Sequence, residues 1–201
     1  MLIALNNVTH FFGYRLILKN VNFCLEKGKL YLLRGRNGSG KSTLLKIMAG
    51  LLKPTEGDVV FNMEKTKIGY LAHSPFIYPY FSAMENLSFF AKIYSLKIDE
   101  EKIIYTLESV GLEKFATEKV KNFSRGMKQR LNLARIFLLS PELLLLDEPE
   151  TGLDEDFIKS LNKKIKEVVD RGGTVVWISH SSTFSYYDVE VRIKDKKLVF
   201  S

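Results

Sequence analysis

The sequence has a single cysteine, Cys24, among 201 residues, so an internal disulfide is excluded. Free cysteines are usually buried, and we expect Cys24 to pack inside the protein rather than to do redox chemistry. Long apolar runs are also missing: the run from Leu143 to Leu146 is short, whereas a membrane-spanning helix needs about 20 apolar residues. The first residues contain neither a basic cluster nor the apolar stretch of a secretory signal, so residence in the cytosol is expected.

The sequence also has no excess of negative charge. Its 30 Lys and Arg residues outnumber its 23 Asp and Glu residues and give a net charge of +7. Such a charge suits nucleic acid, an anionic membrane surface or a solvated lysine-rich surface. The lysines are dispersed along the chain, which favours the solvated surface, and no nucleic-acid partner is expected. The share of hydrophobic residues, 46%, is ordinary for a globular protein, and the length suits one domain with at most a small subdomain.

Hydrophobic periodicity predicts an α/β chain with a helical insertion. The predicted strands cover residues 2–8, 21–25, 29–34, 58–62, 67–71, 143–146 and 174–178, and a final hairpin covers 189–200 and turns near 194–196. The predicted helices are 41–49 and 155–170, and helical character extends from about 84 to 139. The segment from about 74 to 140 is therefore expected to form a helical subdomain inserted into the core.

A glycine-rich segment over residues 35–42 follows an apolar strand and precedes an amphipathic helix. Its pattern, Gly-x-x-x-x-Gly-Lys-Ser, predicts a phosphate-binding P-loop in this context. Small residues let backbone amides point at phosphate oxygens, and the helix N-terminus adds the positive end of its dipole. We expect Lys41 to bridge the β- and γ-phosphates of ATP and Ser42 to ligate Mg²⁺. A glycine-rich turn without a ligand is the alternative. The residues predicted to bind the nucleotide here are Gly35, Asn37, Gly38, Ser39, Gly40, Lys41, Ser42 and Thr43.

A second apolar strand ends in two acids, Asp147 and Glu148. This arrangement suits a central parallel strand whose carboxyl end reaches the nucleotide. Asp147 is expected to hold Mg²⁺, directly or through water. Glu148 points differently from the strand end and is expected to orient or deprotonate the attacking water. An acid pair that merely faces solvent is the alternative.

The order of these motifs resembles the ATP-binding subunit of ABC transporters over essentially the whole chain. The segment 123–130, Phe-Ser-Arg-Gly-Met-Lys-Gln-Arg, resembles the family signature Leu-Ser-Gly-Gly-Gln, and Ser124 is expected to cap a helix whose amides attract an anion. The resemblance implies that this helix clamps the ATP of a second subunit, so that two ATP molecules lie between two head-to-tail copies. It implies nucleotide contacts for Ser124, Arg125 and Gly126, and for Asp154 at the end of a segment that resembles the D-loop.

Two further positions match the family. His180, after a predicted strand, resembles the switch histidine that contacts the γ-phosphate and is expected to be catalytic. Phe12 occupies the place of the aromatic residue that stacks on adenine, although Phe11 and Tyr14 are near enough to serve instead.

Two positions depart from the family pattern. His73 stands where a glutamine is usual; neutral imidazole can hydrogen-bond a water or ligate Mg²⁺, so its sensing role can survive, and a spectator histidine is the alternative. Arg125 and Met127 replace a small residue and a glutamine of the signature. Arg125 either reinforces the contact with the partner's nucleotide or occupies the rim of the dimer.

The resemblance implies an α/β fold: a P-loop NTPase core with a mixed parallel sheet, an N-terminal antiparallel β subdomain and an inserted α-helical subdomain, all in one domain, 1–201. The segment 73–90 looks like the haem-exporter ATPase of cytochrome c maturation, while the Ser-Arg-Gly-Met-Lys-Gln signature also occurs in the ABC-2 export group. An integral-membrane transporter subunit is the implied partner, docking on 74–95, where exposed rings suit a groove. The alternative is that these rings fill the helical core.

The implied function is that of an export-type ATPase subunit. ATP and Mg²⁺ close two copies, identical or paired, hydrolysis assisted by Glu148 reopens them, and the motion acts on the membrane partner from the cytoplasmic side of the cell membrane. A soluble ABC ATPase acting on nucleic acid or the ribosome is the alternative, but such proteins usually carry a coiled-coil insertion, zinc cysteines or two fused cassettes. A small-molecule kinase would leave the signature helix and His180 without a role.

Overall fold

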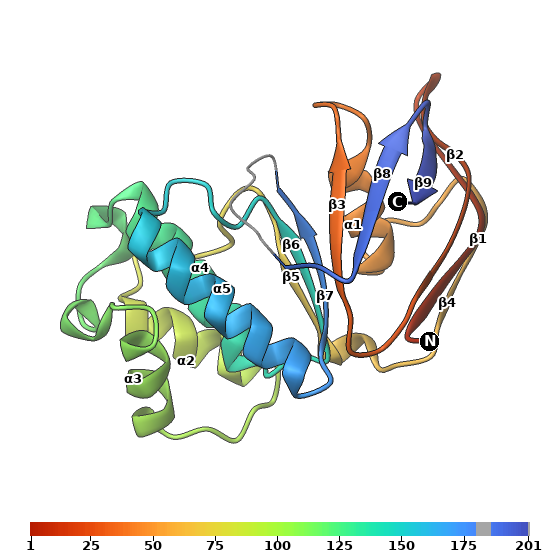
Figure 1. The fold of residues 1–201 in the computed structure, drawn as a ribbon. Helices are drawn as coiled ribbons and strands as arrows, with labels where there is room; N and C mark the ends of the chain where they lie inside the picture. The colour runs from red at the N-terminus through yellow and green to blue at the C-terminus, as the bar shows by residue number, and fades with distance from the viewer. Residues whose placement is uncertain (180–185, 201) are drawn as a thin grey trace.

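The computed structural model describes residues 1–179 and 186–200. The chain forms a six-stranded core sheet, a three-stranded antiparallel sheet and a layer of helices beside the core sheet (Figure 1). The strands are β1 (Ile3–Phe12), β2 (Arg15–Leu25), β3 (Leu30–Gly35), β4 (Glu56–Phe61), β5 (Ile68–Leu71), β6 (Leu143–Asp147), β7 (Thr174–Ile178), β8 (Val189–Lys194) and β9 (Lys197–Phe200). The helices are α1 (Lys41–Met48), α2 (Ala83–Ile93), α3 (Glu100–Glu108), α4 (Arg125–Leu138) and α5 (Glu155–Asp170), with short 3₁₀ turns η1 (Lys65–Lys67), η2 (Glu113–Phe115) and η3 (Val120–Asn122).

The core sheet has the strand order β5-β6-β7-β3-β8-β9. Neighbouring strands are parallel except for β8 and β9, which form an antiparallel hairpin. The carboxyl ends of β3, β6 and β7 therefore meet at one edge of the sheet, where ligands bind in open α/β sheets. The predicted α/β fold class with a mixed sheet is confirmed, and the P-loop and the acid pair share this edge.

Alternating side chains divide the interior into two cores. Leu144 and Leu146 of β6 pack with the helical layer, whereas Leu143 and Leu145 pack with α1 and the antiparallel sheet. Successive residues of a strand face opposite sides, so a central strand covered on both faces must be apolar throughout. All four leucines are fully buried, and each contributes about 2 kcal/mol of hydrophobic stabilisation. The run of leucines positions Asp147 at the end of a strand that is buried at every position.

The antiparallel sheet has the order β2-β1-β4, and its first two strands are longer than predicted. They continue to the turn at Gly13 and Tyr14 because the polar residues near this end are paired: Thr9 Oγ1 accepts a hydrogen bond from the Asn20 amide at 3.0 Å. The expectation that Cys24 is buried is wrong. The alternation of β2 points Phe23 and its other apolar neighbours inward, which leaves Cys24 on the exposed face.

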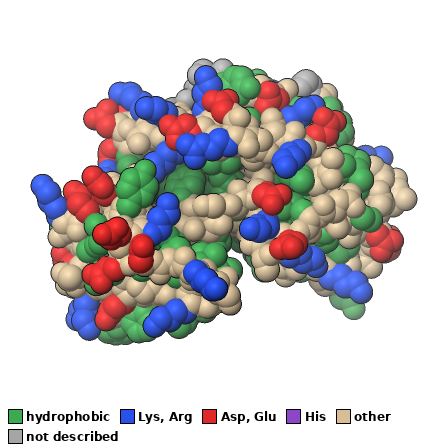
Figure 2. Space-filling model, turned by 90° about the horizontal axis from the view of Figure 1, so that it is seen from below, with side chains coloured by type: hydrophobic (Ala, Val, Ile, Leu, Met, Phe, Trp, Pro, Cys, Tyr) green, Lys and Arg blue, Asp and Glu red, His purple; other side chains and the backbone are tan. Residues whose placement is uncertain are grey.

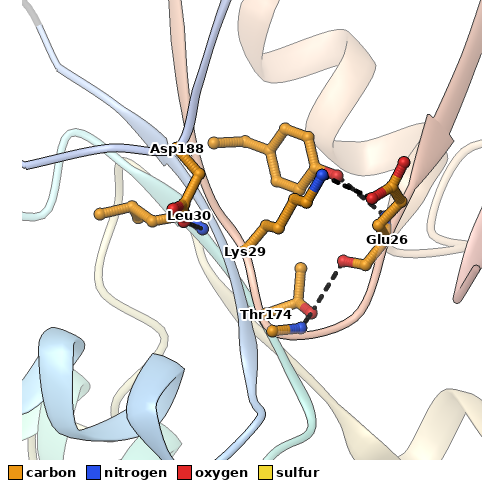
Figure 3. Close-up of polar contacts among 7 residues, drawn as sticks. Glu26, Lys29, Leu30, Thr174 and Asp188 are labelled. Atoms are coloured by element: carbon orange, nitrogen blue, oxygen red, sulfur yellow. Dashed lines mark hydrogen bonds and ion pairs between the residues drawn. The ribbon is translucent and has the colours of Figure 1, made fainter.

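Polar contacts join the end of the antiparallel sheet to the amino-terminal edge of the core sheet (Figure 3). The Thr174 hydroxyl accepts from the Gly28 amide at 2.9 Å and donates to the Glu26 carbonyl at 3.1 Å. The Asp188 carboxylate accepts from the Leu30 amide at 2.7 Å. The chain between β2 and β3 is thereby fastened to the starts of β7 and β8.

The segment with predicted helical character contains α2, α3 and α4, separated by turns rather than continuous. Ser82 and Glu85 form a capping box at the start of α2, and Gly111 with φ +69° lies in the turn after α3. The bounds predicted for 155–170 and 174–178 agree with α5 and β7. Within the ranges that the structure describes, no helix combines the length and the apolar character needed to span a membrane.

Candidate functional site

The glycine-rich segment connects the carboxyl end of β3 to the first turn of α1. Gly40 is the N-cap of α1 and has φ +106°, a left-handed conformation that favours glycine. A Cβ at Gly40 would lie 2.9 Å from Cγ2 of Ile17, so a side chain there would also clash with β2. The loop is thus held against the antiparallel sheet, and α1 presents its free N-terminal amides at the edge that carries the acid pair.

Lys41 occupies the centre of this loop. Its ammonium donates hydrogen bonds to the carbonyl oxygens of Gly35 at 2.9 Å and Arg36 at 3.2 Å. The side chain is only 6% exposed, and burial lowers the pKa of Lys41, partly offset by the charges of Glu148 and Asp147. A cation therefore sits within the loop at the place where the pattern predicts phosphate.

Asp147 ends β6 and is 3% exposed. Burial, with a contribution from the Glu148 charge, raises the pKa of Asp147 above its ordinary value, while a hydrogen bond with the Ser42 hydroxyl and the charges of His73 and Lys41 lower it. The side chains of Ser42 and Asp147 are thus close enough to interact, although they lie far apart in the sequence. A hydroxyl and a carboxylate held together are hard oxygen donors of the kind that Mg²⁺ prefers when phosphates supply its other ligands.

No group of three or more His, Cys, Asp or Glu side chains that could hold a metal ion occurs in the described part of the chain.

Glu148 follows Asp147 in a left-handed backbone conformation with φ +52°, which is uncommon for a residue other than glycine. Its amide donates to the Ile178 carbonyl of β7 at 3.1 Å. The carboxylate oxygen Oε2 lies 3.7 Å from Nδ1 of His73, whose side chain is exposed. The structure therefore brings together two side chains predicted to surround the γ-phosphate, one from the end of β5 and one from the end of β6.

A hollow of about 370 Å³ lies over the loop, lined by Arg15, Ile17, Asn37, Gly38, Gly40, Lys41, Ser42, Thr43 and Glu148. Arg15, which was not predicted to belong to the site, approaches the loop from the start of β2. Its sequence context offers only one sign of a binding role, a cation two residues after Gly13. Phe12 pairs with Arg15 across the β1–β2 turn and is 52% exposed. Directly opposed residues of antiparallel strands share a face, so Phe12 lies on the same side of the hairpin as Arg15.

A larger hollow, of about 730 Å³, opens at the opposite edge of the molecule between α3, α5 and the turn 171–173. Figure 2 looks onto this edge and shows apolar side chains within the hollow and Lys and Arg side chains around it. None of the described candidate residues lines it. The convergence of the loop, the cation and the acids, rather than volume, therefore locates the site.

The N-terminus of α4 carries the segment that resembles the signature. Ser124 caps the helix by accepting from the Met127 amide at 3.2 Å, so the cap predicted from the sequence is confirmed. A Cβ at Gly126 would lie 2.8 Å from the Gly152 carbonyl oxygen. Arg125 lies against Gly152, since a Cβ built at Gly152 would stand 3.3 Å from Arg125 Cγ. Gly126 is therefore also required for packing inside one chain.

Asp154 is the N-cap of α5 and accepts from the Phe157 amide at 2.9 Å. Its other carboxylate oxygen pairs with Arg130, whose guanidinium lies 4.4 Å from the centre of the Phe157 ring. The cap, followed by the ion pair with Arg130, lowers the pKa of Asp154. Inside the chain, Asp154 thus fastens the start of α5 to α4.

Asp154→Ala is expected to lower the melting temperature, because it removes both the cap and the ion pair. Asp154→Asn should lower it less, since asparagine is also a good N-cap. The higher melting temperature of the wild type relative to Asp154→Asn should be present above the ordinary carboxyl pKa. The difference should fade as pH falls through the lowered pKa of Asp154 in the folded protein. Calorimetry of the three proteins at neutral and acid pH measures this, and equal melting temperatures for the alanine and asparagine variants would contradict it.

His180 lies outside the described residues, so its predicted role stays a prediction. Ser179, the residue before it, directly follows β7 and is buried.

Comparison with known proteins identifies the family. The profile described as "ABC transporter" matches residues 18–151. The lantibiotic transport ATP-binding protein SrtF of Streptococcus pyogenes is 38% identical over 185 residues, which cover 89% of this chain and 80% of SrtF. The cytochrome c biogenesis ATP-binding export protein CcmA of Reclinomonas americana is 32% identical over 188 residues, which cover 89% of this chain and 85% of CcmA.

Two solved structures are similar over nearly the whole chain. The ATP-binding subunit of an ABC transporter has a TM-score of 0.88 at 26% identity and covers 98% of this chain and 88% of its own. The ATP-binding cassette MJ0796, solved as a dimer in a post-hydrolysis state with ADP and Pi, has a TM-score of 0.87 at 28% identity and covers 98% of this chain and 96% of its own. With its P-loop and acid pair at one sheet edge, this chain belongs to the ABC transporter family as an ATP-binding, ATP-hydrolysing domain.

Proposed function

We propose that this chain is the ATPase subunit of a membrane ABC exporter and works by nucleotide-driven closure of two copies. One observation carries the proposal: the N-termini of α1 and α4, of the kind that attract anions, do not share a hollow. The N-terminus of α1 lies in the nucleotide hollow, whereas Ser124 at the N-terminus of α4 does not line it. A second copy, or a paired ABC subunit, placed head to tail would bring its Ser124, Arg125 and Gly126 onto the ATP of the first, with Asp154 nearby.

Within one copy, each residue of the site has a distinct role. The amides of Gly35 to Thr43 hold the phosphates, Lys41 bridges the β- and γ-phosphates, and Phe12 stacks on adenine. Ser42 and Asp147 would hold Mg²⁺, which would neutralise charge on the phosphate oxygens. Glu148 accepts the proton of the attacking water and His73 orients that water or ligates the metal. His180 is assigned the γ-phosphate contact.

The segment 74–95 is proposed as the docking surface of an integral-membrane subunit. Its rings divide between core and surface: Phe90 is 2% exposed, whereas Phe76 is 62% and Tyr80 is 72% exposed. Large exposed rings gathered on one segment suit a partner with an apolar helix. We place the protein on the cytoplasmic face of the cell membrane, as one ATPase domain with a helical insertion over about 74–140.

Two kinds of export, each represented by a relative of this chain, are candidates for the transport that it powers. The relative SrtF is named for lantibiotic transport and CcmA for cytochrome c biogenesis, and haem export is the more specific prediction from the sequence. Both names favour transport over a soluble role on nucleic acid or the ribosome. Purifying the chain with its membrane partner and identifying what that partner binds distinguishes the two.

The reaction itself is tested by the fate of the γ-phosphate. ATP labelled at that position and incubated with the purified protein and Mg²⁺ should release free phosphate. Transfer of the label to a small-molecule acceptor in place of release would identify a kinase and contradict the proposal.

His73→Gln should retain hydrolysis and change its pH dependence. A histidine side chain can gain a proton, whereas glutamine stays neutral. A protonated His73 would pair with the Glu148 carboxylate, 3.7 Å away, and would not ligate a metal. The activity of the variant relative to the wild type should therefore rise as pH falls, measured as phosphate release. Ser74→Ala, at the next exposed position, is the control, and superimposable profiles would favour a spectator histidine.

A further inference from the structure

The turn that follows β6 holds Glu148 in a conformation that it would not adopt by itself. A left-handed backbone costs a non-glycine residue free energy and persists only where the surroundings impose it. The amide of Glu148 is held by the Ile178 carbonyl at 3.1 Å. The Glu148 carbonyl accepts from the Thr151 amide at 3.2 Å within the turn, and side chains add contacts that hold the residues that follow.

Glu150 supplies such contacts from its side chain. Its carboxylate oxygen Oε2 accepts from the indole Nε1 of Trp177 at 3.1 Å, and Oε1 accepts from the Ser179 hydroxyl at 2.5 Å. Trp177 is 2% exposed and Ser179 is 3% exposed. Charged acceptors form strong hydrogen bonds, and removing one that serves buried donors costs stability. The carboxylate therefore binds the turn firmly to the end of β7.

The other side of the turn is held by α4. Gln129, which is 4% exposed, donates from Nε2 to the Pro149 carbonyl at 3.1 Å. Residues 148–150 are thus fixed from β7 by the Ile178 carbonyl, Trp177 and Ser179, and from α4 by Gln129. The backbone of Glu148 cannot relax without breaking one of these bonds.

We propose that Glu150 is a positioning residue for ATP hydrolysis. By binding Trp177 and Ser179, it maintains the turn that directs the Glu148 carboxylate, so its loss lowers kcat and leaves ATP affinity at the P-loop unchanged. The inference rests on the proposed function, because it assumes that Glu148 acts in the hydrolytic step. Glu150 itself does not touch the substrate.

The test compares Glu150→Ala, Glu150→Gln and Trp177→Phe with the wild type. Misplacing a catalytic group by about 1 Å costs up to about a hundredfold in rate, so kcat of the alanine variant should fall about ten- to a hundredfold. The glutamine variant should be intermediate, because an amide has one acceptor oxygen where the carboxylate has two. Trp177→Phe removes one donor and keeps an aromatic ring, and should lose less than Glu150→Ala. The dissociation constant for ATP should stay within about twofold of the wild type in all three, because the phosphate cradle is untouched.

Two further measurements separate positioning from simple support of the fold. Trp177 is the only tryptophan in the chain, so its fluorescence should change in the Glu150 variants before any nucleotide is added. The double variant Glu150→Ala/Trp177→Phe should lose less than the product of the two single losses, because each single change removes the hydrogen bond between Glu150 and Trp177. Glu155→Ala, which removes an exposed acid from the first turn of α5, is the matched control and should keep the wild-type kcat.

Each result decides the inference. The inference is overturned by a wild-type kcat in Glu150→Ala or Glu150→Gln. It is also overturned if kcat and ATP affinity fall equally. A lowered melting temperature with unchanged kcat shows a structural role only. If Glu150→Ala does not fold, the glutamine and Trp177→Phe variants decide in the same way. Glu148→Gln in the same assay isolates the premise: full turnover there refutes the role of Glu148, whereas an inactive Glu148→Gln beside a fully active Glu150→Ala refutes only the positioning role.

Discussion

Replacing Lys41 by alanine is expected to reduce ATP hydrolysis by about a hundredfold or more, because phosphoryl transfer depends on positioned charge around the phosphates. The ammonium is buried within the loop and held by the carbonyl oxygens of Gly35 and Arg36. An alanine leaves those carbonyls without their donor and removes the cation that faces the phosphates. Both effects weaken phosphate binding, so the loss should include ATP affinity as well as turnover.

The measurement is phosphate release at saturating ATP, with ATP affinity determined separately. Lys46→Ala provides the control: Lys46 lies in the last turn of the same helix and is exposed. It should retain wild-type turnover, and circular dichroism should show that both variants fold. Near-normal turnover in Lys41→Ala would refute the assignment of the loop.

Glu148→Gln is expected to bind ATP and hydrolyse it about 10² to 10⁴ times more slowly. Glutamine keeps the size of the side chain and can accept a hydrogen bond, but it cannot take the proton of the attacking water. Because Lys41, Ser42 and the loop amides are unchanged, ATP should remain bound. The protein should then accumulate in the state that precedes hydrolysis.

In the proposed mechanism that state is the closed pair of subunits, so light scattering should show a dimer of Glu148→Gln that depends on ATP. Glu142→Gln, which removes an exposed acid just before the other end of β6, should hydrolyse ATP normally and serve as the control. A Glu148→Gln variant that binds ATP and stays monomeric would contradict the clamp formed by Ser124 of a second copy.

Much of the site follows from local sequence. The P-loop is recognisable because its glycines and Lys41 are contiguous, and Asp147 and Glu148 because a run of leucines precedes them. The bounds of α5 follow from its 3.6-residue periodicity, and those of β7 follow from a continuous apolar run that begins after Gly172 and Gly173. The pairing of Ser42 with Asp147 follows once both segments are assigned to the carboxyl edge of one sheet.

Other features depend on contacts that no local pattern encodes. Glu150 reaches Trp177 and Ser179, 27 and 29 residues further along the chain, and nothing in the sequence around Glu150 distinguishes it from a solvated acid. Arg15 reaches the nucleotide hollow only because a hairpin places it there. The prediction for Cys24 was wrong because it relied on the usual burial of cysteine, whereas the alternation of β2 sets which face it occupies.

The fastening at the amino-terminal edge of the core sheet has a consequence for how ATP can change the molecule. Thr174 and Asp188 tie the starts of β7 and β8 to the chain before β3, far from the edge that carries Lys41 and Glu148. The chain that leaves the antiparallel sheet is therefore anchored to the core sheet at the edge remote from the nucleotide. We expect ATP binding to rearrange the edge that carries Lys41 and Glu148 and to leave this anchored edge in place.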